Sequence, residues 1–141
     1  MHNHESVGIL MLAAMFPRIG FRLATKIPSP LPGTAIEHLA SKISHAFLYF
    51  CIVFMPVSGL AFGYFSCWGV PFFAWNIPGA PKEDYGPRYQ AIENFFYEKH
   101  HQVGSILNYV LPLHIGATVY HVMKGHAIFR RMNPFVKAIK D

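Results

Sequence analysis

A long stretch without any acidic or basic side chain covers residues 46–81, and no other feature limits the fold of this chain as strongly. Its first part, residues 46–65, is apolar and long enough to cross the roughly 30 Å hydrocarbon core of a membrane as an α-helix. Of all residues, 52% are hydrophobic and only 13% are charged, about half the charged share of a typical soluble domain. The sequence therefore predicts an integral membrane protein.

We expect an all-α helical bundle, a single domain with three transmembrane helices. The first helix is expected at about 5–26, the second at about 43–65 and the third at about 97–126. An interfacial loop at about 66–96 is rich in aromatic residues, which is typical of the lipid headgroup region. A basic tail follows at 127–141. An amphipathic targeting segment is the alternative for the first helix, which carries Arg18 and Arg22 near its end.

The positions of the basic residues predict the orientation in the membrane. Most of them flank the connection between the first two helices or lie at and after the end of the third helix, whereas the loop at 66–96 holds two basic and three acidic side chains. The positive-inside rule then places the N-terminus outside and the C-terminus inside. This distribution accounts for the net charge of +5, so no nucleic-acid partner is expected.

Three of the nine histidines share one face of the third predicted helix. His100, His114 and His121 are 14 and 7 residues apart, which places them on a single stripe at 100° per residue. Ionisable side chains inside a membrane usually serve a ligand or a proton path. Because imidazole is a standard axial ligand of haem iron, two helices that each offer one histidine predict a haem site.

His4 and His100 are the predicted axial ligands of the haem iron. Both are expected at the outer ends of their helices, and each is followed four residues later by a glycine, Gly8 or Gly104. A glycine one turn further on the same face leaves room for a porphyrin plane. The alternative is that both histidines are ordinary polar residues of the membrane interface.

No second histidine pair is expected. His45 would open the second helix at the inner side, whereas His114 would lie at mid-depth in the third helix, and His101 points away from the stripe. His2, His38 and His126 are predicted to be solvated at the membrane surfaces. The sequence has no nucleophile, phosphate-binding or zinc-binding motif.

The chain resembles the bacterial-type cytochrome b561 family, the di-haem, four-helix membrane cytochromes related to the cytochrome b subunits of hydrogenases. The likeness covers nearly the whole chain and rests on the segments at 4–8, 28–30, 44–49, 55–59, 113–115 and 131–134, together with Arg18, Arg22, His100 and His121. The matching helices are the second, third and fourth of the family, and the first has no counterpart here.

The resemblance implies that His4 and His100 hold the outer haem. It also implies that the inner haem needs a histidine from the family's first helix, so His114 is expected to be a ligand only if another chain supplies its partner. We therefore expect one haem b and no second one. Arg88, Lys99 or nearby tyrosines are the candidates for hydrogen bonds to the haem propionates.

The leading hypothesis is a b-type cytochrome subunit that transfers electrons within a larger respiratory complex. Its expected partners are other membrane subunits and lipid, and the resemblance adds quinone. The main alternative is a haem-less structural or accessory subunit derived from a cytochrome b561, and the third is a self-sufficient enzyme that reacts with superoxide or quinone. The sequence favours a mitochondrial inner membrane over a bacterial one.

Overall fold

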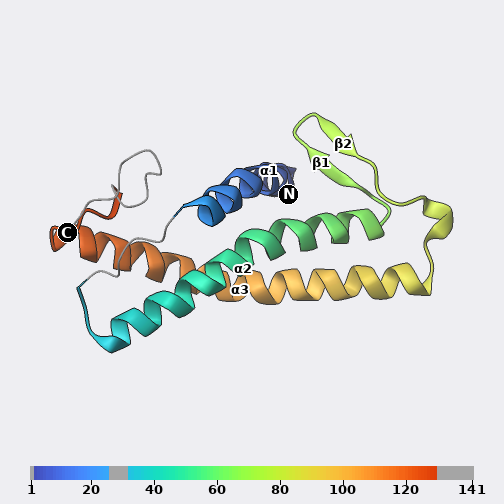
Figure 1. Cartoon of the computed structure of the whole chain (residues 1–141). Coiled ribbons are helices and arrows are strands. Elements are labelled where there is room, and N and C mark those ends of the chain that lie inside the picture. Colours follow the sequence, from blue (N-terminus) through green and yellow to red (C-terminus); the bar gives the residue numbers. More distant parts are fainter. Residues whose placement is uncertain (1, 26–31, 130–141) are drawn as a thin grey trace.

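Residues 2–25 and 32–129 are described in the computed structural model, which contains three long helices (Figure 1). A short hairpin and a 3₁₀ turn lie between the second and third helices. The elements in chain order are α1 (His2–Ala24), α2 (Ala35–Phe65), β1 (Val70–Phe72), β2 (Trp75–Ile77), η1 (Lys82–Asp84) and α3 (Pro87–Met123). The all-α prediction is confirmed, with the hairpin as an addition.

The two longest helices, α2 and α3, run side by side in opposite directions, and α1 packs against α2 with its first turns beside the hairpin (Figure 1). All three helices are long and apolar enough to cross a membrane. Most of their large apolar side chains face outward, as expected where lipid is the solvent. Three candidate spans are therefore confirmed, whereas the direction of crossing stays a prediction.

Helix α2 begins at Ala35, eight residues earlier than predicted. Thr34 and Glu37 form a capping box there: the Glu37 amide donates to the Thr34 hydroxyl, and the Thr34 amide donates to the Glu37 carboxylate at 2.7 Å. These bonds satisfy amides that a helix end leaves without partners. The extra turns carry the helix beyond its purely apolar part.

Helix α3 begins at Pro87, ten residues earlier than predicted, so the connection after α2 is shorter than the predicted loop. Proline at the first helical position costs no hydrogen bond, because an amide there has no partner within the helix. The prolines at 28–30, the segment at 131–134 and most of the predicted basic tail lie outside the described residues.

The hairpin pairs β1 with β2 in antiparallel register, with Val70 opposite Ile77. Gly69 precedes it with a φ of +80°, and a side chain on Gly69 would collide with the Ile77 carbonyl oxygen. At the turn, the Phe73 amide donates a 2.7 Å hydrogen bond to the hydroxyl of Ser6, which is fully buried. This bond attaches the hairpin to the first turns of α1.

Candidate functional site

His4 of α1 and His100 of α3 lie together, as the sequence predicts. Their ring centroids are 5.9 Å apart and the ring planes are perpendicular. His4 is exposed and His100 is half-buried. The arrangement brings together two imidazoles from helices that are far apart in the sequence.

Two neighbouring residues of α2 hold the His100 ring. The Ser58 hydroxyl, which is 1% exposed, lies 2.9 Å from His100 Nδ1. A Cβ atom on Gly59 would come within 3.3 Å of His100 Cε1, so only glycine lets the ring lie this close to the α2 backbone. The sequence reasoning missed both residues, although they lie in the 55–59 segment that carries the family resemblance.

The two glycines predicted to leave room for a porphyrin, Gly8 and Gly104, differ in the space beside them. No atom lies within 4 Å of the place that a Cβ on Gly8 would take, so the α1 side is open. On the α3 side, Met55 Cε lies 3.3 Å from the corresponding position on Gly104. The space beside Gly104 therefore holds the end of a flexible methionine side chain.

The structure brings His45 and His114 together, and the prediction that they lie at different depths is wrong. Their ring centroids are 5.2 Å apart, and the Ser44 hydroxyl lies 3.5 Å from His114 Nδ1. The error follows from the start of α2: because the helix begins at Ala35, His45 lies ten residues inside it and not at its end. His114 therefore has a neighbouring histidine in this chain, whereas its role as a ligand stays a prediction.

A third histidine contact forms where α3 ends. His121 and His126 stack with centroids 5.3 Å apart, and their Nδ1 atoms are 3.2 Å apart. His126 is therefore half-buried against His121 and not freely solvated as predicted. His101, in contrast, is exposed and stacks on Tyr97 away from the His4 and His100 pair. His38 is half-buried, and the side chain of His2 lies outside the described part of the chain.

The two basic residues proposed as propionate partners lie at different distances from the pair. Lys99 adjoins His100 in sequence, and its ammonium group donates to the Gln102 side chain at 3.0 Å. Arg88 is twelve residues from His100 on the same helix, which is about 18 Å along the helix axis. Of the two, only Lys99 lies near the histidines.

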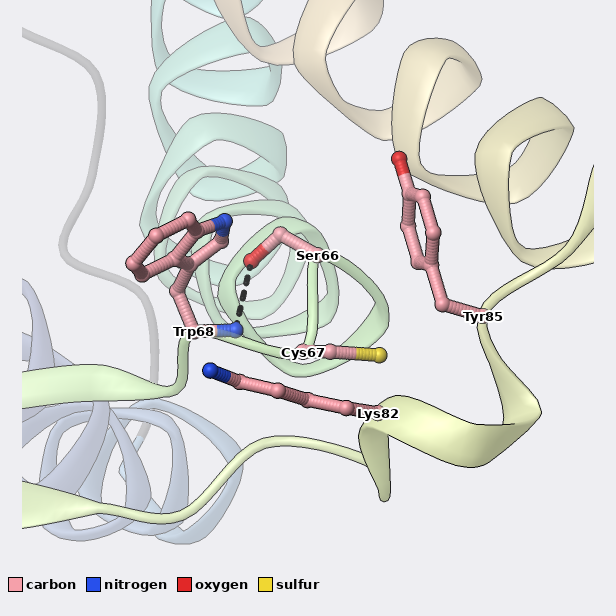
Figure 2. A pocket seen from close by; sticks show the side chains of 5 residues that line it. All are labelled: Ser66, Cys67, Trp68, Lys82 and Tyr85. Carbon is pink, nitrogen blue, oxygen red and sulfur yellow. Dashed lines mark hydrogen bonds between the residues drawn. The ribbon is translucent and has the colours of Figure 1, made fainter.

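A hollow of about 300 Å³ at the end of α2 is a weaker candidate (Figure 2). Lys82 lies over the Trp68 ring at 5.2 Å, and the Cys67 thiol donates to the Pro81 carbonyl. Partial burial and the nearby Asp84 and other acidic residues raise the pKa of Cys67. The thiol therefore stays protonated at neutral pH, which suits neither a nucleophile nor a metal ligand.

Residues 1–134 match the family of prokaryotic cytochrome b561. The chain belongs to this family. Membership implies a membrane b-type cytochrome that transfers electrons, and the family typically binds haem b. No curated protein and no solved structure matches the chain. Because the matching family is prokaryotic, the prediction of a mitochondrial membrane and of a respiratory chain has no support.

The residues of this cytochrome b561 fit a haem group. Neutral imidazoles are standard axial ligands of haem iron, and His4 and His100 face each other from different helices. The open face at Gly8 suits a flat group, and Met55 beside Gly104 ends in a flexible chain that can move. The donor set and the space around it therefore agree with the cofactor of the family.

Proposed function

We propose that this cytochrome b561 carries electrons through one haem b whose iron is bound by His4 and His100. The observation that carries the proposal is the edge-to-face contact of these rings at 5.9 Å. A haem group, when bound, accepts and releases one electron at a time. His4 and His100 would hold the iron of the bound group and would leave it no position for a further ligand, so the site suits electron transfer and not the binding of a further substrate.

The side chains around the pair have distinct tasks in this proposal. Ser58 and Gly59 hold the His100 ring at a fixed place on α2, so that its orientation is set before the cofactor binds. Gly8 leaves the space for the porphyrin plane on α1. Lys99 is the cation nearest to the site in sequence and is proposed to pair with a propionate.

We also propose that the chain works beside other membrane proteins. Apolar side chains cover the outer faces of all three helices, as shown by Leu23 of α1, Ile36 of α2 and Leu113 of α3, each more than 70% exposed. In a membrane these faces contact lipid or other subunits. An electron-transfer complex supplies the donor and acceptor that a protein with one haem needs. The family resemblance makes quinone a candidate acceptor.

One observation favours the second candidate function, a haem-less structural subunit. Met55 Cε fills the space beside Gly104, so this side of the site is packed by the chain itself. In that case the histidines serve packing and hydrogen bonding only.

Absorption spectra of the purified protein, oxidised and then reduced with dithionite, distinguish the two functions. We expect a sharp low-spin α-band and one haem per chain by pyridine haemochrome assay. His100→Ala should remove the haem, whereas the matched variants His101→Ala and His126→Ala should keep it. Equal haem content in all three variants would rule out the proposed ligands. A wild-type protein without haem would support the function as a haem-less structural subunit. Two haems per chain would add His45 and His114 as a second site.

A further inference from the structure

The hydrogen bonds of Ser58 determine which nitrogen of His100 carries the proton. The Ser58 hydroxyl is in contact with two groups: the Met55 carbonyl oxygen at 3.1 Å and His100 Nδ1 at 2.9 Å. A serine hydroxyl has one hydrogen to donate and can also accept. A carbonyl oxygen has no hydrogen, so the contact with Met55 uses the hydrogen of the serine.

The contact between Ser58 and His100 therefore needs a hydrogen from the imidazole. Nδ1 must carry it, because Nδ1 is the atom that lies 2.9 Å from the hydroxyl oxygen. A neutral imidazole with a hydrogen on Nδ1 has its lone pair on Nε2. The reverse tautomer would leave only one of the two serine contacts as a hydrogen bond, at a place where Ser58 is almost completely buried.

We infer that Ser58 is a positioning residue that holds His100 in the Nδ1-protonated tautomer and presents the Nε2 lone pair to a metal. This inference rests on the proposed haem ligation for its purpose, whereas the tautomer itself follows from the three hydrogen-bonding groups alone. A hydrogen bond from the second nitrogen is the usual way in which proteins fix the orientation of a ligating histidine and raise its basicity.

A more basic imidazole stabilises ferric haem relative to ferrous haem, so Ser58 should lower the midpoint potential. Gly59 assists from the same turn of α2, because the absent side chain lets the ring approach the serine. Ser105 on α3 offers a matched control. Its hydroxyl is exposed and donates to the His101 carbonyl at 2.9 Å, so Ser105→Ala removes a serine hydrogen bond without touching the His100 ring.

The first test is the ¹⁵N NMR spectrum of the histidine side chains in detergent-solubilised protein without haem, with His100 assigned from the His100→Gln variant. We expect a protonated Nδ1 and a bare Nε2 in the wild type and in Ser105→Ala, and a mixture of tautomers in Ser58→Ala. A proton on Nε2 in the wild type would overturn the inference. This measurement does not depend on haem, so it decides the tautomer even if the proposed haem ligation fails.

The second test uses the haem-loaded protein. Ser58→Ala should weaken haem binding by about 10- to 100-fold, the usual cost of losing the partner of a ligating histidine, and should raise the midpoint potential. Ser58→Thr keeps the hydroxyl and should restore both values towards those of the wild type. If Ser58→Ala has the affinity and potential of Ser105→Ala, the positioning role is refuted.

Discussion

Gly59→Ala is the substitution that most directly tests how α2 holds the His100 ring. The added Cβ would lie 3.3 Å from His100 Cε1 and 3.6 Å from Nδ1, whereas ordinary contacts begin at about 3.4 Å. The backbone of α2 cannot retreat easily, because Ser58 beside it is buried. We therefore expect the ring to move by a few tenths of an ångström, away from the hydroxyl that orients it.

Stability and haem binding should respond differently to this change. Alanine is about 1 kcal/mol more favourable than glycine within a helix. Weakening the bond between Ser58 and His100 costs about 0.5–1.5 kcal/mol. These contributions oppose each other, so the free energy of unfolding should change little. Haem affinity has no such compensation and should fall about tenfold, the lower end of the range for a disturbed ligand partner.

Gly116→Ala is the matched control, because it lies on α3 and has no atom within 4 Å of its added Cβ. Haem affinity is measured by titrating each detergent-solubilised variant and following the Soret absorbance, and stability is measured by thermal unfolding. The reasoning predicts weaker haem binding in Gly59→Ala and unchanged binding in Gly116→Ala. Equal affinities for the two variants would refute the role assigned to the glycine.

Two further predictions concern the segment between α2 and α3. Ser6→Ala removes the acceptor of the Phe73 amide, at a cost of about 1 kcal/mol, so hydrogen exchange of the 70–77 amides should become faster than in Ser105→Ala; equal rates would contradict the attachment to α1. The Tyr85 hydroxyl donates to Glu93 at 2.7 Å, which raises the pKa of Tyr85. The contribution of this hydrogen bond to folding stability is therefore complete below the pKa of about 10 of an unfolded tyrosine. It is lost as the pH rises through the higher pKa of Tyr85 in the folded protein. The phenolate difference spectrum between the wild type and Tyr85→Phe should show this raised midpoint, and Glu93→Gln should lower it; identical midpoints would disprove the cause.

Hydrophobicity and helical spacing were sufficient to predict the three helices and the His4 and His100 pair. The pair could be predicted because each histidine is followed by a glycine at a helical spacing. The expectation that His100 opens its helix was wrong, since α3 begins at Pro87, thirteen residues earlier. The helix starts could not be predicted from hydrophobicity, since the first turns of α2 and α3 mix charged and polar residues with apolar ones. Their signals were Thr34 with Glu37 and Gly86 with Pro87, which are capping patterns that do not depend on apolar residues.

The side-chain contacts between different helices could not be predicted from the sequence. Ser58 and Gly59 act on His100 only through the register of α2 against α3, and a sequence carries no direct record of that register. The hairpin was missed for a similar reason: its three-residue strands are too short to show an alternating pattern. It also depends on the distant Ser6.

The same register explains why the contact between His45 and His114 is not by itself a sign of a second haem. Ser58 meets His100, and Ser44 meets His114, so the contact repeats after fourteen residues on both helices, which is close to four whole turns. The register that brings positions 58 and 100 together therefore also brings positions 44 and 114 together, about 21 Å along the bundle.

The His4 and His100 pair differs from the His45 and His114 pair in the helix that supplies the partner of the α3 histidine. His45 belongs to α2, the helix that already packs directly on α3, whereas His4 comes from α1 with the open face of Gly8 beside it. A planar group such as haem needs an open face of this kind. To admit haem between His45 and His114, the directly packed helices α2 and α3 would have to move apart. One haem per chain, lost on substitution of His4 and kept on substitution of His45, is the result that this difference predicts.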